Sequence, residues 1–554
     1  MQVSQASSRE ATKLPSSPGG TLFLVSLSLL CAAAVVGASI RHTGSIAFPI
    51  DDGYIYSNYV LSAAHGQPFV YNSGESSGGI TSIAWYILCT LSYWFLEPFS
   101  ALFGHVIAGK PASLEATHLY LAAYLPGVLS LTATALGVRR LTLICLQGVA
   151  PLLTGTLPIA LSLLAGSVAA ADLGLVWGSL SGLESTFAAA LAVWAVCLLV
   201  QDVSRGAPRW SLLAIGLLPW ARPDLLALLF ACLVWLTQSA LLSRDAERRA
   251  LFTYILLYFV ASAVGMAILS GIYLAGWGRP LPSSFYAKVG GLRLGGRFFS
   301  AVQELLAAGR YLPFVAAGTA VVGGLLSSFR PGVGSRPSVG VLRLTPLLLL
   351  LVSLFYTLGI LLTLPWFGQE DRYLLPVHPF VIVLLALLLY RLIPVQRVEL
   401  LRRVSPLLVG IVLLIALPLS NYLVSTRDYV VEVRNIADAH IKPALWLAAN
   451  TPASAIVASE PIGAVKLFSD RLTVDLVGLT TPATLGTYRD WPRAWPALRK
   501  LGVTYLLYYP NWFDERRPPA WATERAHFDI HDNRIAGDNV IAIYELHWDR
   551  YLQP

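Results

Sequence analysis

The chain has 554 residues, of which 56% are hydrophobic and only 13% are charged, and its mean hydropathy is +0.63. Soluble domains carry a charge on about a quarter of their residues, so this composition excludes an ordinary soluble protein. The net charge of +8 comes from arginine-rich loops rather than from one basic patch, so it does not indicate nucleic-acid binding. Basic loops of this kind record membrane topology.

Apolar segments recur along the chain, and each is long enough to cross about 30 Å of hydrocarbon. The first, at about 21–40, follows Arg9 and Lys13 of a short tail at 1–20. We expect it to be a retained span rather than a cleaved signal peptide, because the later spans need it to set their orientation. Further spans are expected at about 117–138, 147–170, 184–200, 250–275, 307–328, 344–365, 374–393 and 404–424.

Two apolar segments do not fit a single crossing. Residues 80–104 are interrupted by Glu97-Pro98, and a full crossing would place Arg139-Arg140 on the wrong side, so an interfacial or re-entrant helix is expected. Residues 209–240 have basic residues at both flanks and a break at 220–224, which predicts a hairpin. With these assignments, about eleven helices cross the membrane in a domain at 21–427.

Positive loops mark the cytoplasmic side, so the N-terminus is expected inside and the loop at 42–80 outside. The C-terminal region at 428–554 then lies outside, and its composition changes to polar and mixed. Strands are predicted at SAIVASE, RLTVDLVG, VTYLLYY and NVIAIYEL, and helices at IADAHIKPALWLAANTP and RDWPRAWPALRKLG. The predicted fold is a polytopic α-helical membrane protein with a small extracytoplasmic α/β domain at its C-terminus.

Charged residues within or beside the spans gather on the outer side of this path. Adjacent carboxylates at the edge of a bilayer, such as Asp51-Asp52, are costly to place, and charges of this kind tend to face cavities. An outward-opening polar cavity is therefore expected. The charges that map to this side are Asp51, Asp52, Asp172, Glu184, Arg222, Asp224, Lys288, Glu370, Asp371 and Arg372.

Each charge also has a purely structural explanation. One aspartate of Asp51-Asp52 would suffice as a helix cap, and Arg222 with Asp224 could be an ion pair that holds the hairpin turn. Lys288 could be an interfacial lysine whose ammonium reaches the headgroups. These explanations are less convincing together, because all the charges would have to share one side by chance.

The residue types in this predicted cavity suit the transfer of a sugar from a lipid phosphate. A carboxylate can deprotonate a hydroxyl group or hold a divalent cation, and Lys or Arg can bind a phosphate leaving group. Aromatic rings offer faces for sugars; the candidates are Tyr54, Tyr56, Tyr59, Trp85, Tyr86 and Trp366.

Seven short motifs carry a resemblance to a known family. They are Asp51-Asp52-Gly53-Tyr54-Ile55, the G-x-x-x-x-Y-N-x-G-E run at 66–75, the G-x-T-S-x-x-W run at 79–85, Ser181-Gly182-Leu183-Glu184-Ser185, Arg222-Pro223-Asp224, the P-x-x-x-Y-x-K loop at 282–288 and Asp371-Arg372-Tyr373-Leu374-Leu375-Pro376. In this order, over about 45–480, the chain resembles the GT-C superfamily of polyprenyl-phosphate-sugar-dependent glycosyltransferases. The likeness is to bacterial arabinofuranosyltransferases and RgtA-like enzymes, although Gly78-Gly79 departs from the commoner E-G pair.

The resemblance implies a role for each matching residue. Asp51 would be the general base, and Asp52 would orient the acceptor or help to hold a divalent cation (Mg, Mn or Ca), with Asp51 and Asp52 as tentative ligands. The residues implied to bind the donor phosphate are Lys288, Arg222 and Arg372. The implied sugar or acceptor pocket comprises Tyr54, Glu75, Thr81, Trp85, Glu184, Asp224 and Asp371.

The implied partners are a polyprenyl-phosphate-linked sugar, a glycan or lipid acceptor and the bilayer of a bacterial plasma membrane, in cell-envelope or cell-wall polysaccharide synthesis. The sequence leaves the sugar, the acceptor and the metal dependence open. A transporter or flippase of lipid-linked saccharides is the alternative, but it needs charges on a path through the bilayer rather than on one side. A catalytically inactive sugar-binding scaffold is a further alternative, against which the intact Asp51-Asp52 argues.

Overall fold

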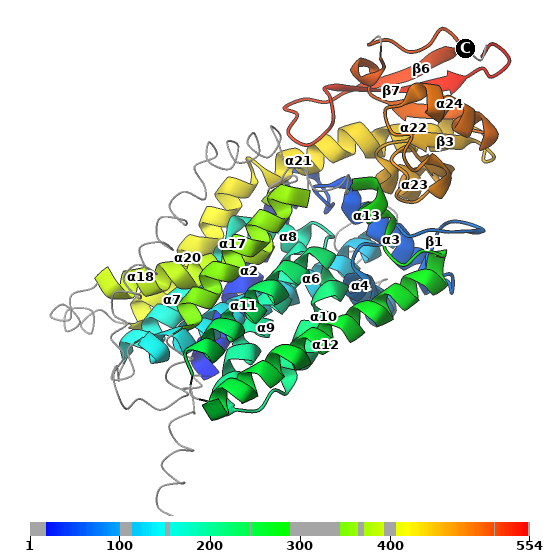
Figure 1. Cartoon of the computed structure of the whole chain (residues 1–554). Coiled ribbons are helices and arrows are strands. Elements are labelled where there is room, and N and C mark those ends of the chain that lie inside the picture. Colours follow the sequence, from blue (N-terminus) through cyan, green and yellow to red (C-terminus); the bar gives the residue numbers. More distant parts are fainter. Residues whose placement is uncertain are drawn as a thin grey trace, which may run out of the picture.

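A computed structural model describes residues 18–99, 114–149, 156–243, 245–288, 344–363, 371–392, 406–514 and 516–551. Long helices form a bundle, and a domain that contains a sheet sits on one end of it (Figure 1). The long helices of the bundle are α2 (Pro18–Thr43), α6 (Leu114–Val149), α7 (Thr156–Ala171), α9 (Ser185–Arg205), α11 (Leu226–Leu241), α12 (Asp245–Trp277), α17 (Thr345–Thr363), α18 (His378–Leu392) and α20 (Pro406–Ser425).

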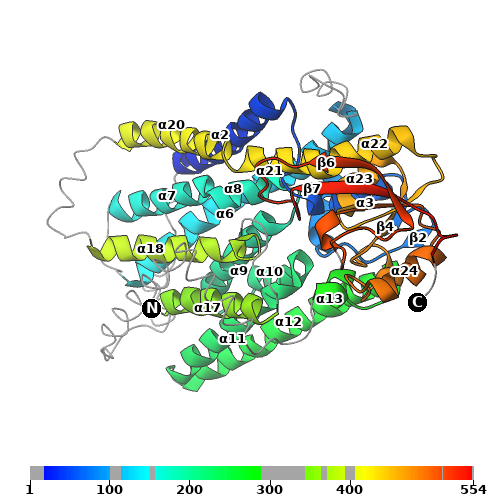
Figure 2. The ribbon, with the colours of Figure 1, turned by 90° about the horizontal axis from the view of Figure 1, so that it is seen from above.

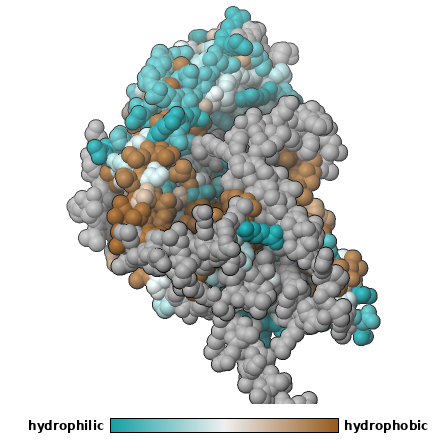
Figure 3. Space-filling model, turned by 90° about the vertical axis from the view of Figure 1, so that its left-hand side faces the viewer, coloured by the Kyte–Doolittle hydropathy of each residue, from teal (hydrophilic) through white to brown (hydrophobic). Residues whose placement is uncertain are grey.

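Within the described residues, seven helices are long and apolar enough to cross a membrane, or eight if the pair α7 and α8 (Leu173–Leu180), bent by 49°, forms one span. Helix α12 buries only 17% of its most apolar window inside the protein, as expected for a helix that faces lipid. Much of the coloured surface of the bundle in Figure 3 is hydrophobic, and the domain above it is mostly hydrophilic. The predicted polytopic membrane fold is confirmed. The predicted span at 307–328 lies outside the described residues, so the count of eleven stays a prediction.

The expected hairpin at 209–240 is present. Helix α10 (Trp210–Ala221) ends at Arg222, whose backbone is extended, a short 3₁₀ turn follows (η2, Pro223–Leu225), and α11 then begins. Both helices pack against α12. Arg222 therefore lies at the apex of two helices and not inside a continuous one.

The segment expected not to cross the membrane contains α4 (Ile83–Leu96), which has 14 residues. Near the start of α4, the Trp85 indole N–H donates to the carbonyl oxygen of Gly182. Near its end, the carbonyl oxygen of Tyr93 contacts the ring of His118, in the first turns of α6. A 3₁₀ turn (η1, Glu97–Phe99) follows. Both ends of α4 thus lie near the end of the bundle that carries the C-terminal domain, which agrees with a non-crossing helix.

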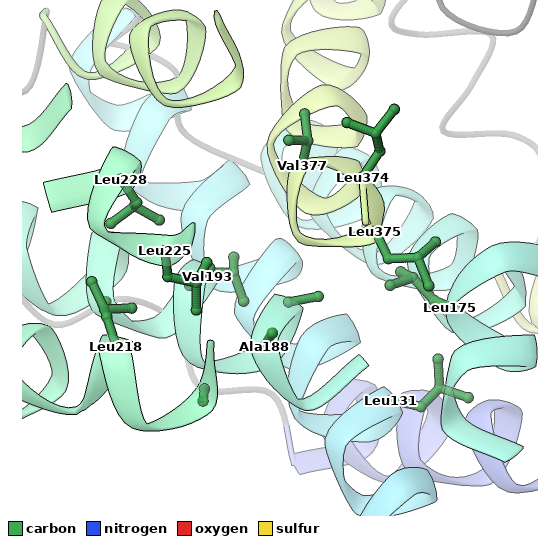
Figure 4. Packing of buried hydrophobic residues seen from close by; sticks show 14 of the residues in the cluster. Leu131, Leu175, Ala188, Val193, Leu218, Leu225, Leu228, Leu374, Leu375 and Val377 are labelled. Atoms are coloured by element: carbon green, nitrogen blue, oxygen red, sulfur yellow. The ribbon is translucent and has the colours of Figure 1, made fainter. Parts of the chain in front are cut away.

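A hydrophobic core joins the helices beneath that end. Figure 4 shows side chains from α6, α8, α9, α10 and α11 that meet the turn leading into α18, which contains η4 (Leu375–Val377). Because these side chains are fully or almost fully buried, they fix the ends of the helices whose loops carry the polar motifs. The labelled residues are Leu131, Leu175, Ala188, Val193, Leu218, Leu225, Leu228, Leu374, Leu375 and Val377.

The C-terminal domain is built on a five-stranded sheet of order β4-β3-β5-β7-β6. The strands are β3 (Ile456–Ser459), β4 (Leu472–Asp475), β5 (Tyr505–Tyr508), β6 (Ala522–Asp529) and β7 (Val540–Leu546). Strand β3 is parallel to β4 and β5, whereas β7 is antiparallel to both β5 and β6. The four predicted strands are present. Edge strand β6 was not predicted, because its sequence ATERAHFD has little apolar content.

Helices cover both faces of this sheet, as Figures 1 and 2 show. Helix α24 (Trp491–Lys500) packs on one face through Trp491, Trp495 and Leu498. Helices α22 (Lys442–Asn450) and α23 (Ile462–Ser469) pack on the other through Leu447 and Val465. A helix α21 (Tyr429–Ile436) and a π-helical turn η6 (Ala437–Ile441) lead from the bundle into α22.

The first outer loop joins the bundle to this domain. It contains α3 (Asp51–Ala64) and a small hairpin of β1 (Val70–Asn72) and β2 (Glu75–Ser76). The Asn58 side-chain amide donates to the carbonyl oxygen of Gly463 at 2.9 Å, and the Tyr71 hydroxyl donates to that of Ile462 at 2.7 Å. Asn72 bonds both the N–H and the carbonyl oxygen of Thr473. The loop thereby packs on α23 and β4.

Gly463 allows this close approach, and its replacement gives a first prediction. A Cβ atom at position 463 would lie 2.3 Å from the Asp51 carbonyl oxygen and 2.9 Å from the Ile55 nitrogen, both backbone atoms. We expect Gly463→Ala to destabilise the protein by about 2 kcal/mol, because neither helix can yield without moving its backbone. Thermal unfolding in detergent measures this.

Gly37 of α2 is the matched control, since a Cβ atom there would meet nothing within 4 Å. Gly37→Ala should leave the unfolding temperature unchanged or raise it slightly. Equal unfolding temperatures for the two variants would contradict the tight packing of α3 on α23.

Candidate active site

A cavity of about 440 Å³ lies between the bundle and the C-terminal domain. This volume falls in the usual range for small-molecule sites. Its charged lining consists of three carboxylates and two guanidinium groups, from Asp52, Glu184, Asp224, Arg222 and Arg372. Its apolar lining includes Ile55, Leu183, Leu226, Met266, Leu281, Phe285 and Leu479.

Arg222 is the centre of one ion-pair network. Its guanidinium group lies 2.8 Å from a carboxylate oxygen of Asp224 and 3.3 Å from one of Glu184, and its side chain is only 6% exposed. The Tyr356 hydroxyl donates to Asp224 at 2.7 Å. A buried cation requires such partners, because its desolvation is otherwise not offset. Arg222 thus forms the ion pair with Asp224 that was considered from the sequence, and a second ion pair with Glu184.

Arg372 forms a second pair, with Asp52, at 2.8 Å. Its side chain is 5% exposed, and its Nε and Nη1 atoms have no hydrogen-bond partner among the described residues. The ring of Tyr373 lies 5.0 Å from the guanidinium of Arg222 and 5.1 Å from that of Arg372. The Tyr373 ring thus makes a cation–π contact with each arginine, and the two guanidinium groups lie near each other.

Local turns explain why these motifs meet at the cavity. Ser82 caps α4 by accepting the Trp85 N–H, and its hydroxyl donates to the carbonyl oxygen of Trp220. A Cβ atom on Gly53 would lie 2.4 Å from the Ser181 carbonyl oxygen, so this glycine lets α3 approach the loop that carries Glu184. Asp371 has φ +52°, a left-handed turn that aspartate tolerates, directly before Arg372.

Two short segments complete the wall of the cavity. Helix α13 (Ser283–Lys288) contributes Ser284, whose hydroxyl bonds that of Thr81 at 2.9 Å. The Ser283 hydroxyl donates to the carbonyl oxygen of Leu479, in the loop after β4. The C-terminal domain is therefore part of the cavity wall, through Leu479.

Seven of the residues singled out from the sequence line the cavity: Asp52, Tyr56, Thr81, Glu184, Arg222, Asp224 and Arg372. Three others have different positions. Tyr54 and Trp85 are fully buried in the core, where their rings support the neighbouring motifs, and Glu75 is exposed on the β1–β2 hairpin. These three are thus not among the cavity-lining residues.

Asp371 turns the backbone beside the cavity without lining it in the described structure. Lys288 ends α13, and its side chain lies outside the described residues. Its expected contact with a phosphate therefore stays a prediction. Tyr373 also lines the cavity. Tyr373 was not singled out, although it lies inside the Asp371–Pro376 motif.

Asp51 differs most from the sequence-based expectation. Its carboxylate accepts the N–H groups of Gly463 at 2.7 Å and Ala464 at 2.9 Å, at the N-terminus of α23, and lies 3.1 Å from Nδ1 of His440. A helix N-terminus stabilises a carboxylate in this way. Asp51 thus binds the C-terminal domain, and Asp52 is the aspartate on the cavity.

The tentative assignment of Asp51 and Asp52 as metal ligands does not fit this geometry. N–H donors already bind both oxygens of Asp51, and Arg372 pairs with Asp52. The described part of the chain contains no group of three or more His, Cys, Asp or Glu side chains that could hold a metal ion.

Two acidic residues of the C-terminal domain were not singled out as site residues. Burial raises the pKa of Glu460, which follows β3, to about 7. Burial also raises the pKa of Asp475, at the end of β4, to about 6, although the backbone N–H groups of Val477 and Thr480 bind its carboxylate. Both lie within the stretch at about 45–480 over which the chain resembles the family, but none of the seven motifs contains them.

Comparison with solved structures identifies the fold. ArnT from Cupriavidus metallidurans bound to undecaprenyl phosphate aligns with a TM-score of 0.55 and 13% identity, over 96% of this chain and 98% of that chain. Its apo form aligns with a TM-score of 0.53 and 14% identity, over 95% and 98%. An oligosaccharyltransferase from Archaeoglobus fulgidus, in complex with Zn and sulfate, gives a TM-score of 0.49 and 13% identity, over 95% and 74%. The chain has the ArnT fold. The expected GT-C-like fold is confirmed.

Sequence comparisons add little about activity. A family model described as "Domain of unknown function (DUF8728)" matches residues 432–546, which is most of the region predicted as the C-terminal domain. No curated protein matches this chain. The activity must therefore be inferred from the cavity.

The Arg222 network gives a second prediction. Arg222→Gln leaves the carboxylates of Glu184 and Asp224 without their cation, so we expect a loss of about 3–5 kcal/mol of stability. Adding Glu184→Gln and Asp224→Asn to this variant should recover much of the loss, because no unpaired charge remains. Thermal unfolding of the variants measures both effects.

The exposed pair of Arg493 and Asp490 on α24 is the matched control, since these side chains are 70% and 41% exposed. Arg493→Gln should change stability by less than about 0.5 kcal/mol. If Arg222→Gln were as mild as this control, the ion pairs of Arg222 would not be buried.

Glu460 gives a prediction on pH dependence. Its pKa in the folded protein, about 7, is above the ordinary value of 4.5, so the folded state holds more protons between these values. Stability from this group is full below pH 4.5 and is lost as pH rises through 7. Because water partly screens this group, we expect the free energy of unfolding to fall by about 1–2 kcal/mol over this pH range.

Thermal unfolding of Glu460→Gln across this pH range tests the assignment. The variant should be less sensitive to pH than the wild type, whereas Glu524→Gln, at an exposed position on β6, should keep the wild-type slope. An unchanged slope in Glu460→Gln would contradict the raised pKa.

Proposed function

We propose that this protein is an inverting membrane glycosyltransferase that moves a sugar from a polyprenyl-phosphate donor to a hydroxyl group of a glycan or lipid. The main support is the cavity itself, where Asp52 and two arginines face an apolar wall. Phosphate and sugar need the polar side, and a polyprenyl chain needs the apolar side. Undecaprenyl phosphate bound to ArnT, which has the same fold, supports this class of donor.

Arg372 and Arg222 are proposed to bind the donor phosphate. Arginine binds phosphate oxygens through several N–H groups at once, and Arg372 has two nitrogen atoms without a partner among the described residues. Glu184 and Asp224 keep the Arg222 side chain in place and line the space next to it. We assign them to the sugar pocket together with Thr81 and Tyr56.

The proposed base is Asp52 rather than Asp51, because the Asp51 carboxylate binds the N-terminus of α23. Asp52 takes the proton of the acceptor hydroxyl, whose oxygen then attacks the anomeric carbon. The bond between that carbon and the phosphate oxygen breaks, and its electron pair leaves with polyprenyl phosphate. Attack opposite the leaving group inverts the anomeric configuration. When Arg372 binds the phosphate, its hold on Asp52 weakens and the carboxylate becomes more basic.

The proposed setting is a bacterial plasma membrane and the synthesis of a cell-envelope polysaccharide. The Arg139 guanidinium donates to the Thr21 hydroxyl at 3.2 Å. Thr21 lies in the first turn of α2, whereas the C-terminal domain contacts the first outer loop, which follows the other end of this helix. Arginines at that end favour a cytoplasmic location for it. The cavity and the C-terminal domain would then face the outside.

Asp52→Asn gives the functional prediction. We expect the release of lipid phosphate from a panel of polyprenyl-phosphate sugars to fall at least 100-fold, because the base is lost while the amide keeps the shape. The unfolding temperature should also fall, because the Arg372 guanidinium is only 5% exposed and loses its carboxylate partner, so transfer is measured well below that temperature. Asp51→Asn should lower the unfolding temperature as well, because it weakens the cap on α23.

Glu75→Gln is the control, because this carboxylate is exposed on the β1–β2 hairpin. It should transfer sugar at the wild-type rate. A wild-type rate in Asp52→Asn would rule out Asp52 as the base. Transport of labelled lipid in liposomes without a new glycosidic bond would favour a flippase instead.

A further inference from the structure

The C-terminal domain gathers polar and aromatic side chains where its parallel strands end. Glu460 follows β3, Tyr509 follows β5, and Tyr488 and Arg489 lie in the loop before α24. Trp512 ends a 3₁₀ turn (η8, Pro510–Trp512) after β5. We call these five residues the carboxyl-edge cluster. The mechanism proposed above uses none of them.

The topology of the sheet favours binding at this edge. From β3, the middle one of the three parallel strands, the chain crosses by α23 to β4 on one side, and from β4 it crosses by α24 to β5 on the other side. The two helices cover opposite faces of the sheet. In open α/β sheets, ligands bind at the carboxyl ends of strands where the order reverses in this way. Glu460 directly follows the strand at this reversal.

Glu460 interacts electrostatically with the first outer loop and with the rest of the cluster. The charged groups that act on its carboxyl group are His440, Asp51, Asp475 and Asp52, and Glu460 itself acts on Tyr488. No hydrogen bond or ion pair engages its side chain within the part of the chain that the structure describes, and the side chain is partly exposed. A partly buried carboxylate of this kind can accept hydrogen bonds from a ligand.

Arg489 and two rings form the outer part of the cluster. The guanidinium lies 4.1 Å from the centre of the Trp512 ring and 5.3 Å from that of Tyr488. A Cβ atom on Gly537 would meet Trp512 at 2.4 Å, so the loop at Gly537 packs tightly on this ring and holds it in place. Arg489 is exposed, and Tyr488 is 36% exposed, so both are accessible to a ligand.

The composition of the cluster selects among ligand classes. A sugar has hydroxyl groups that donate to a carboxylate and accept from a guanidinium, and its C–H face can pack on an aromatic ring. Three carboxylates, those of Asp51, Asp52 and Asp475, act on Glu460 against one imidazole, that of His440, so the balance of charge disfavours an anionic group at Glu460. A neutral saccharide fits better than a phosphorylated one.

We propose that the carboxyl-edge cluster binds the saccharide of the acceptor, a neutral sugar chain. This rests on the proposed function and specifies its acceptor class. Glu460 accepts a hydrogen bond from a sugar hydroxyl, Arg489 donates to a neighbouring unit, and the Tyr488 ring packs on its C–H face. A chain bound in this way extends past Glu460 toward Asp52, so a hydroxyl of its end unit can reach the cavity.

Binding to the full-length protein in detergent tests the proposal. The probes are gluco-, manno-, galacto- and arabino-oligosaccharides of two to six units, with mannose 6-phosphate as the charged comparison, and saturation-transfer NMR gives the affinities. We expect at least one neutral oligosaccharide to bind, and Arg489→Ala and Tyr488→Ala each to weaken its binding at least tenfold. Glu460→Gln should weaken it too, because an amide accepts less strongly than a carboxylate. Arg493→Ala, at an exposed arginine of α24, should bind like the wild type.

The outcomes separate this proposal from the function on which it rests. Asp52→Asn should bind the oligosaccharide like the wild type while it loses transfer. If no oligosaccharide binds, if the cluster variants bind as tightly as the wild type, or if mannose 6-phosphate binds more tightly, the saccharide site is wrong, whatever the transfer assay shows. If saccharide binding follows the expected pattern but no donor releases lipid phosphate, the site stands and the glycosyltransferase function fails.

Discussion

The contact between the Asp51 carboxylate and the N-terminus of α23 determines how the two parts of the molecule fit together. Two backbone N–H groups and His440 bind this carboxylate, and Gly463 lets the backbones approach. Successive residues on a helix point about 100° apart, so the neighbouring Asp52 faces a different direction, toward the cavity. Asp51 thus binds the C-terminal domain and Asp52 lines the cavity, and the contact of Asp51 with α23 fixes the direction in which Asp52 points.

The cavity combines an ion network with an apolar wall. Arg222 has its charge matched by Glu184 and Asp224, whereas Arg372 pairs with one carboxylate among the described residues, that of Asp52. The ring of Tyr373 lies beside both guanidinium groups. In a medium of low polarity such groups exert strong fields on a ligand, so a small displacement of one arginine changes the potential that a phosphate would meet.

Much of this arrangement is predictable from the sequence, because charges in an apolar chain are conspicuous. The positions of Arg222 and Asp224 at a hairpin apex follow from the hairpin break, and the location of Arg372 and Asp52 on the same side follows from the clustering of charges. The ion pair between Arg372 and Asp52 was not predicted. The separate role of Asp51 was not predicted either, since it depends on Gly463, more than 400 residues away along the chain. Glu460 was missed for a similar reason, since segments distant in the chain bury it. Strand β6 was missed because it is a mostly exposed edge strand with a polar sequence.

The contact of Leu479 with α13 has a consequence for attempts to recombine this molecule with a relative. The family model matches residues 432–546, which suggests a module that could be exchanged by itself. However, the loop after β4 supplies Leu479 to the cavity, and α23 and β4 are bonded to the first outer loop through Asn58, Tyr71 and Asn72. A chimera that replaces only the sheet domain would break these contacts. A chimera that keeps these contacts must therefore exchange the sheet domain together with α3 and the β1–β2 hairpin, two stretches that are far apart in the chain.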